Sequence, residues 1–283
     1  MYGAIIGDVS GSYLEILEIT ELRNKSQRPY EERIKILDKE VPLFDNNCSC
    51  TDDSILTVAI ADAIINNRDY EEVLREYGER ELKDWEIKGG RSRFGHGFVE
   101  WLKHEKEGDS LGNGCAMRIS PVGYLFNSEE EVLEEARKAT IPSHNHTESI
   151  KGAQEVAMAI FLARNGYSKE QIKKYLEDKF EMNFDYDIEE LIHNYKFNGT
   201  IMKTTPMALF CFFESNSFED AIRKTLSIGG DTDTLACIVG SISEAYYGID
   251  EELINEVQKY IPEYFKPIIN QFYNKKGLVY EKN

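Results

Sequence analysis

The sequence has little of what marks several large classes of protein. Only seven prolines occur among its 283 residues, and no low-complexity stretch suggests a linker between domains. The five cysteines are scattered without a Cys-x-x-Cys pair, which favours reduced thiols over a disulfide framework. No segment approaches the ~18 consecutive apolar residues of a membrane span, and Met1–Ile6 lacks the basic start of a signal peptide. We therefore predict one cytoplasmic domain, residues 1–283, without a membrane partner.

Positive charge is also scarce, because 33 Lys and Arg residues stand against 51 Asp and Glu residues and give a formal net charge of −18. A chain with this charge repels anions, so we expect no sequence-independent binding to nucleic acid or to anionic membranes. Any phosphate group that the protein binds must be held locally, by backbone amides, helix N-termini or metal ions.

Most of the chain carries apolar residues three or four positions apart, which is the period of an α-helix, and alternating strand patterns are few. We predict one compact all-α domain. Its expected helices are Ser54–Ile65, Tyr70–Leu82, Glu129–Thr140, Ile150–Arg164, Lys169–Tyr175, Phe218–Leu226, Leu235–Tyr247 and Glu251–Tyr260. The glycine-rich segment Lys88–Asn113 is the longest predicted loop, and loops of that length in a compact domain usually have a function.

Two acidic clusters stand where helices should begin. Thr51, Asp52 and Asp53 precede one apolar helical run, and Asp231, Asp233 and Thr234 precede another about 180 residues later. Each cluster alone fits helix capping, because hydroxyl and carboxylate oxygens accept the free amide hydrogens of a first turn. Asp231 and Asp233 can converge only if the backbone between them is still extended, which Gly229 and Gly230 permit.

Together the two clusters offer more carboxylates than the capping of two helices requires. A ligand set made only of oxygen favours Mg²⁺ or Mn²⁺ over zinc, and a pair of ions would offset the repulsion among the acidic groups. An EF-hand is excluded, because the loop glycine and the closing glutamate are missing after Asp231. A two-metal phosphohydrolase stays open as an alternative. So does a zinc site made of the residues Cys48, Cys50, His144 and His146.

Three further segments have both a structural and a functional interpretation. Glycines at positions 3, 7 and 11 form a smooth stripe for close helix packing, and Glu15 just beyond them is by itself a surface carboxylate. Gly112, Asn113 and Gly114 form either a plain turn or a nest of amides for an anion. His144 is either a structural histidine or a contact to a sugar or phosphate.

Taken in order, five segments resemble the ADP-ribosylglycohydrolase family, which includes the glycohydrolase that reactivates nitrogenase reductase. They span residues 3 to about 248, with two departures: Ser54 replaces the Thr of many relatives, and Leu235 and Cys237 follow the second aspartate cluster. The segments are Gly-Ala-Ile-Ile-Gly-Asp-Val-Ser-Gly-Ser-Tyr-Leu-Glu (3–15), Thr-Asp-Asp-Ser (51–54), Gly-Asn-Gly-Cys-Ala-Met-Arg (112–118), Ser-His-Asn-His (143–146) and Gly-Gly-Asp-Thr-Asp-Thr (229–234).

The resemblance implies a single orthogonal helical domain with two Mg²⁺ ions at the bottom of an ADP-ribose cleft. Glu15 would lie beside the ions on a mobile segment, His144 would contact the substrate, and Lys88–Trp101 would help to line the cleft. Gly112, Asn113 and Gly114 would cradle the diphosphate. The implied metal ligands are Thr51, Asp52, Asp53, Asp231, Asp233 and Thr234.

The implied reaction is hydrolysis of the bond between ribose C1″ and an acceptor, which is an ADP-ribosylated protein or small molecule. Its transition state resembles an oxocarbenium ion, and either Glu15 or Asp53 would act as the catalytic carboxylate. An arginine-type linkage is preferred as the substrate. An ADP-ribose receptor without turnover is the competing interpretation.

Overall fold

The computed structural model describes residues 1–88, 94–104 and 108–276, and this part of the chain is helical without a named strand. Turns and loops join the helices, including the long connection of residues 36–51, and isolated bridges pair Asp109 with His144 and Gly112 with Thr200. The all-α prediction is confirmed. No helix in the described part of the chain is both long and apolar enough to cross a bilayer. The helices are α1 (Tyr2–Arg23), α2 (Tyr30–Lys35), α3 (Asp52–Asn66), α4 (Tyr70–Lys88), α5 (His96–Leu102), α6 (Gly114–Met117), α7 (Ser120–Leu125), α8 (Glu129–His144), α9 (Thr147–Arg164), α10 (Lys169–Phe180), α11 (Ile188–Asn194), α12 (Ile201–Phe213), α13 (Phe218–Ile228), α14 (Thr232–Tyr247), α15 (Glu251–Val257), the 3₁₀ turn η1 (Glu263–Phe265) and α16 (Lys266–Lys276).

Each expected helix is present, and most of them extend beyond the range that periodicity predicts. The helix α5 was not expected, because it lies inside the segment Lys88–Asn113 that we predicted as a loop. Residues 89–93 and 105–107 of that segment lie outside the described residues. The capping residues explain several helix starts: Ser128 and Ser168 each form a capping box, and Asp187 accepts the amide hydrogen of Glu190.

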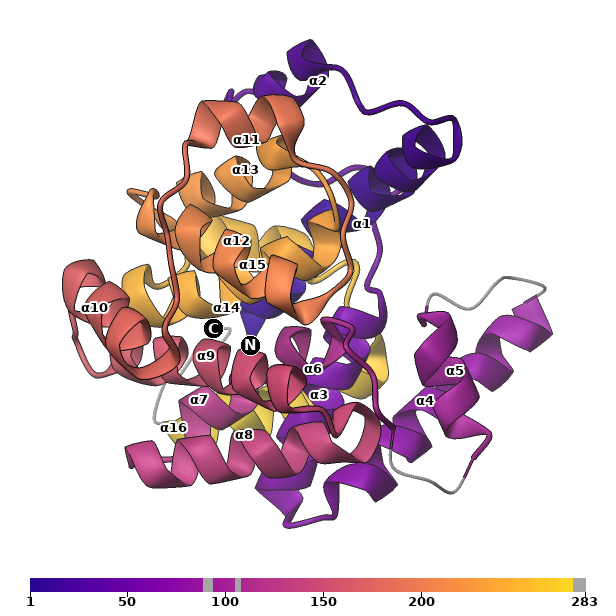
Figure 1. The fold of residues 1–283 in the computed structure, drawn as a ribbon. Coiled ribbons are helices and arrows are strands. Elements are labelled where there is room, and N and C mark those ends of the chain that lie inside the picture. Colours follow the sequence, from indigo (N-terminus) through magenta and orange to yellow (C-terminus); the bar gives the residue numbers. More distant parts are fainter. Residues whose placement is uncertain (89–93, 105–107, 277–283) are drawn as a thin grey trace.

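Helices α1 and α14 pack against each other near the centre of the fold (Figure 1). Their backbones approach so closely that a Cβ atom built on Gly7 would lie 1.9 Å from the carbonyl oxygen of Ala236, and one on Gly3 would lie 2.1 Å from that of Gly240. The glycine stripe therefore serves the close packing that its spacing predicts. This contact sets the N-terminal half of α1 against the first turns of α14.

The remaining helices surround this central pair. Helices α8 and α9 pack against each other below it, α2, α11 and α13 gather at the top of the view, and α4 and α5 stand at one side (Figure 1). Buried apolar side chains of many helices make one continuous core. All five cysteines are free thiols, as predicted.

Candidate metal centre

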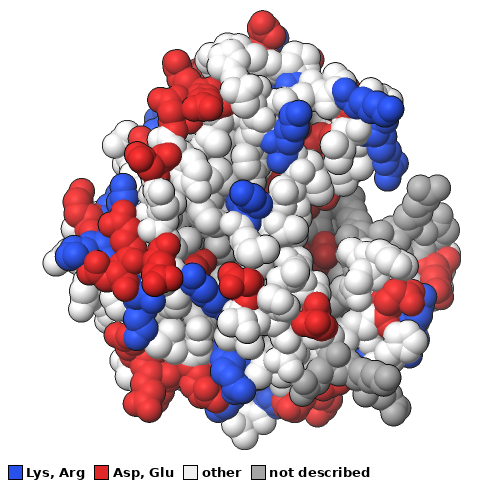
Figure 2. All heavy atoms as spheres, in the orientation of Figure 1, with Lys and Arg blue, Asp and Glu red and all other residues white. Residues whose placement is uncertain are grey.

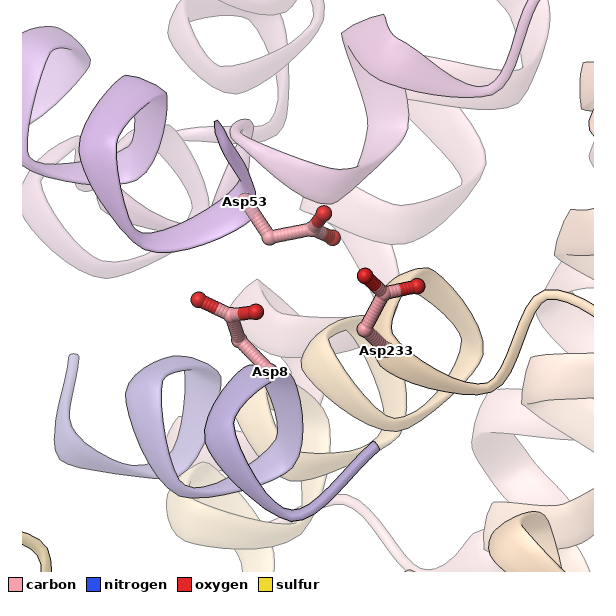
Figure 3. A group of neighbouring side chains, drawn as sticks. All are labelled: Asp8, Asp53 and Asp233. Atoms are coloured by element: carbon pink, nitrogen blue, oxygen red, sulfur yellow. The ribbon is translucent and has the colours of Figure 1, made fainter. Parts of the chain in front are cut away.

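The acidic residues of the two predicted clusters lie together although they are far apart in the sequence. Asp53 lies in the first turn of α3, Asp231 is the N-cap of α14, and Asp233 lies in the first turn of α14. Carboxylate oxygens of Asp8, Asp53 and Asp233 lie within 4.8 Å of one another, and so do those of Glu15, Asp231 and Asp233. Figure 3 shows Asp8, Asp53 and Asp233 pointing toward one another from three helices. Asp233 belongs to both groups.

The turn before α14 explains how Asp231 and Asp233 converge. Gly229 and Gly230 have φ values of 76° and 82°, a left-handed conformation that glycine adopts without a steric cost. Asp231 at the N-cap is still non-helical, with φ −81° and ψ 75°, whereas Asp233 is already helical. The cap residue Asp231 is thus non-helical but not extended as predicted, and this single departure from helical geometry is enough to bring both carboxylates together.

Asp8 is the site residue that sequence reasoning missed. Its carboxylate accepts hydrogen bonds from the amides of Thr51 (2.9 Å) and Ser54 (3.1 Å) and from both of their hydroxyl groups. It thus caps helix α3 from the neighbouring helix α1 and fixes the turn that carries Asp53. The only signal in the sequence was a carboxylate among small and apolar residues of a helix, where a charge must find partners.

Burial and mutual repulsion dominate the electrostatics of the cluster. Burial raises the pKa of Asp53 well above its usual range, and the charges of Asp8 and Asp52 raise it further. Burial likewise raises the pKa of Asp233, and the charge of Glu15 adds to this effect. No lysine or arginine in the described chain forms an ion pair with Asp8, Asp53 or Asp233. These carboxylates therefore lack a compensating positive charge from the protein.

This donor set fits a hard divalent cation. Every candidate ligand offers oxygen, and Asp53 Oδ1 is buried without a hydrogen-bond partner in the described structure. The other oxygen of Asp53 accepts from the Thr51 hydroxyl (3.3 Å) and the Thr234 hydroxyl (3.4 Å), so both threonines stand at the cluster. Of the predicted metal ligands, the two groups contain Asp53, Asp231 and Asp233, together with Asp8 and Glu15. Asp52 belongs to neither group, although it lines the adjoining cavity.

The carboxylates open into a cavity of about 320 Å³. Figure 2 shows acidic side chains over much of this face of the molecule and a hollow in which acidic atoms are visible at depth. Gly95, Gly97 and Phe98 reach the cavity from the described part of the segment Lys88–Trp101. All predicted site residues except Thr51 line the cavity, namely Glu15, Asp52, Asp53, Gly112, Asn113, Gly114, His144, Asp231, Asp233 and Thr234.

The glycine segment beside the metal centre differs from the predicted nest of free amides. The amide of Gly112 donates to the Ser110 hydroxyl (3.1 Å), and the amide of Asn113 donates to the carbonyl of Gly199 (2.9 Å). The Asn113 side chain instead donates to Asp231 Oδ2 (2.7 Å) and to the Thr204 hydroxyl (3.1 Å). This segment therefore positions a carboxylate, and two of its amides already have partners within the protein.

The structure distinguishes His144 from His146. His144 is the last residue of α8 and lines the cavity, whereas His146 is the N-cap of α9 and accepts the amide hydrogen of Glu148. No candidate metal group in the described chain includes Cys48 or Cys50, so the alternative zinc site is not formed. Glu15 lies within helix α1.

The fold and the site together define an all-helical protein with a cluster of buried carboxylates that could hold a divalent cation and that adjoins a cavity. Residues 1–280 match the family model described as ADP-ribosylglycohydrolase. The chain therefore belongs to the ADP-ribosylglycohydrolase family, which is a family of glycosidic-bond hydrolases.

Individual relatives agree with this assignment. The chain is 25% identical over 262 residues to the ADP-ribosylhydrolase ARH3 of Danio rerio, with 71% of this chain and 70% of that protein covered. It is 25% identical over 146 residues to the ADP-ribosylarginine hydrolase Tri1 of Pseudomonas putida, with 50% and 39% covered. A solved structure titled ADP-ribosylglycohydrolase-related protein complex shares the fold, with a TM-score of 0.69, 19% identity and coverage of 97% of this chain and 95% of that one.

Proposed function

We propose that residues 1–283 act as one catalytic domain that hydrolyses the glycosidic bond between ribose C1″ of ADP-ribose and a modified acceptor. The observation that carries the proposal is the pair of three-carboxylate groups that share Asp233 and open into one cavity. A shared carboxylate between two groups of oxygen ligands suits two neighbouring cations. We expect Mg²⁺ in both positions, with Mn²⁺ as a possible substitute because it accepts the same ligands.

The proposed ligands come from the N-terminal ends of α3 and α14. They would be Thr51, Asp52, Asp53, Asp231, Asp233 and Thr234, with Asp8 holding the first turn of α3 in place. When bound, the ions lower the pKa of a coordinated water and orient the hydroxyl groups of the ribose.

The roles of the two candidate catalytic carboxylates follow from their surroundings. Asp53 is buried, belongs to the group of Asp8 and Asp233, and accepts hydrogen bonds from two threonines, which suits a metal ligand. Glu15 is half-buried on the cavity wall, beside Asp231 and Asp233. We assign to Glu15 the removal of a proton from the attacking water, and the nearby carboxylates would stabilise the positive charge that develops on the ribose.

An arginine-type linkage is our preferred substrate. The guanidinium group of a modified arginine carries positive charge, and a cavity lined by carboxylates attracts a cationic acceptor. The similarity to an ADP-ribosylarginine hydrolase supports the same choice. The acceptor would be a modified protein or a small molecule, and the net charge of −18 argues against nucleic acid.

A substrate panel tests the proposal. The purified protein is incubated with ADP-ribosyl-arginine, ADP-ribosyl-serine and ADP-ribosyl-guanidine in the presence of Mg²⁺, and the products are separated by chromatography. We expect free ADP-ribose, released fastest from the arginine and guanidine conjugates. Binding without release would indicate a receptor, and release of phosphate or AMP would indicate a phosphohydrolase.

Matched variants separate metal binding from proton transfer. We expect D52A and D233A to abolish turnover together with Mg²⁺ binding. E15Q should lose turnover by at least about a hundredfold and still bind Mg²⁺, because glutamine keeps an oxygen beside Asp231 and Asp233 but cannot act as a base. D178N serves as the control, because Asp178 is exposed and, among the described residues, forms an ion pair only with Lys174 on the same helix. Near-normal turnover in D52A or D233A would refute the assignment of the metal ligands.

A further inference from the structure

A buried arginine borders the cavity without a carboxylate partner. Arg118 has no exposed surface, lines the cavity, and forms no ion pair with any described acidic side chain. Its Nη2 atom donates to the carbonyl of Ala139 (3.1 Å) and to the Ser143 hydroxyl (2.8 Å), while Nε and Nη1 are buried without a hydrogen-bond partner. Burial lowers the pKa of Arg118 to about 10, so the guanidinium stays charged at neutral pH. An uncompensated buried charge is costly, and an anionic ligand would reduce that cost.

The hydrogen bond from Arg118 to Ser143 bears on which atom donates in the hydrogen bond between Ser143 and His144. The Ser143 hydroxyl lies 2.7 Å from Nδ1 of His144. A hydroxyl group has one hydrogen to donate, and a guanidinium can only donate. Among the described residues, the Ser143 hydroxyl forms hydrogen bonds only with Arg118 and His144, so Nδ1 is the only acceptor for its buried hydrogen. We therefore infer that Nδ1 is the unprotonated nitrogen. The proton of a neutral His144 therefore resides on Nε2.

The surroundings of His144 keep the ring neutral and turn Nε2 toward the cavity. Burial lowers the pKa of His144 well below its usual range, and the charge of Arg118 lowers it further. A Cβ atom built on Gly114 would lie 3.4 Å from Nε2, and one on Gly112 would lie 3.7 Å from it. Both glycines line the cavity. The Nε2–H group therefore lies beside the part of the cavity that Gly112 and Gly114 line. The amides of Gly112 and Asn113, two of the donors expected there, already donate to other atoms of the protein.

We propose that Arg118 is a positioning residue: through Ser143 it fixes His144 as the Nε2–H tautomer, which donates a hydrogen bond to a phosphate oxygen of the substrate. The buried charge of Arg118 also makes this part of an otherwise acidic cavity attractive to an anion. The identity of the phosphate group as the diphosphate of ADP-ribose rests on the proposed function. The tautomer of His144 and its dependence on Ser143 do not rest on the proposed function.

The tautomer is measured directly on the full-length protein. Histidine labelled with ¹⁵N gives distinct couplings and shifts for the Nε2–H tautomer, the Nδ1–H tautomer and the imidazolium, and H144Q identifies the signal of His144. We expect the Nε2–H form in the wild-type protein at neutral pH, and loss of this single form in S143A. Finding the Nδ1–H form or the imidazolium in the wild-type protein would overturn the proposal.

Calorimetric titration with ADP-ribose and with adenosine measures the effect on phosphate binding. We expect S143A to weaken ADP-ribose binding about tenfold, as the loss of a hydrogen bond to a charged group implies, and to leave adenosine binding unchanged. In turnover, KM should rise with little change in kcat. R118M should weaken ADP-ribose binding at least as much, and R118K should recover part of it.

A matched control separates this role from a general loss of packing. Arg223 is also a buried arginine that donates to backbone carbonyls, those of Ile36 and Asp38, but it does not line the cavity. R223M should lower the unfolding temperature and leave the Kd for ADP-ribose unchanged. If R118M does not fold, S143A and the wild-type tautomer still decide the question.

The outcomes separate this proposal from the proposed function. Equal ADP-ribose binding by the wild-type protein and S143A would refute the role of Arg118 and Ser143, even if the enzyme hydrolyses ADP-ribosyl-arginine. Conversely, failure to cleave any conjugate, combined with the Nε2–H tautomer and weaker ADP-ribose binding in S143A, would refute the proposed reaction and support the positioning role.

Discussion

Replacing Asp233 with asparagine should stabilise the metal-free protein while abolishing its function. Asp233 belongs to both carboxylate groups, each with oxygens within 4.8 Å of one another. Two unit charges at that separation repel by about 3.5 kcal/mol at an effective dielectric constant of about 20. Burial and the neighbouring charges raise the pKa of Asp233, so protonation can relieve part of this repulsion, and we expect D233N to gain about 1–3 kcal/mol, or about 2–6 °C in Tm.

The gain in stability of D233N over the wild-type protein should increase with pH. A raised pKa means that the folded state binds the proton more tightly than the unfolded chain does. The cluster therefore favours folding below the ordinary pKa of 3.8, and this contribution is lost as the pH rises through the raised pKa of Asp233. The difference in Tm between D233N and the wild-type protein should be small near pH 4 and largest above neutral pH.

Thermal melting in EDTA and in excess Mg²⁺ measures both effects. The wild-type protein should gain stability with Mg²⁺, because an ion that binds only the folded state shifts the unfolding equilibrium, and D233N should gain none. The amide of D233N can still accept the hydrogen bond from the Thr234 amide, which is 2.8 Å long, so helix α14 should start normally. D178N, at an exposed ion pair, should change Tm little in either buffer. The reasoning is refuted if metal-free D233N melts below the wild-type protein or keeps the wild-type response to Mg²⁺.

Three further substitutions test the framework of the site. G7A places a Cβ atom 1.9 Å from the Ala236 carbonyl oxygen, so it should separate α1 from α14 and cost about 3 kcal/mol in urea unfolding; an unchanged midpoint would contradict the close packing. N113A removes the hydrogen bond to Asp231 and should weaken Mg²⁺ binding by about 10–100-fold in a titration, whereas wild-type affinity would show that Asn113 does not position this ligand. R33M leaves the buried Glu18 with only Arg28, 3.4 Å away, and should lower the free energy of unfolding by about 3–5 kcal/mol; a loss below about 1 kcal/mol would mean that the buried pair contributes little.

Apolar spacing in the sequence predicts helices such as α13 and misses others, including α5 and α12. Helix α13, with Ser217 as its cap, follows the predicted range closely. Helix α12 was not predicted, because it is apolar on nearly all sides, contains Pro206 and begins without a side-chain cap. Helix α5 was missed because Gly95 and Gly97 at its start are typical of loops. Apolar spacing is a signal within one segment, and a helix whose own residues include glycine or proline can escape it.

The same limit applies to the site. The doubled pattern of carboxylates at two helix starts predicts the cluster of Asp53, Asp231 and Asp233, because capping alone does not require so many acids. Asp8 could not be placed from its own segment, since its partners Thr51 and Ser54 belong to another helix. Whether the amides near Gly112 are free depends on a carbonyl from residue 199, which only the folded chain brings near.

The central contact between α1 and α14 has a consequence for how the protein would acquire the proposed ions. Asp8 and Glu15 lie near the beginning of the chain, whereas Asp231 and Asp233 are synthesised after most of the other helices. A nascent chain that still lacks α14 therefore has neither complete group of ligands. Ions could therefore bind only after α1 has packed against α14. In the cell, ion binding would mark the final stage of folding.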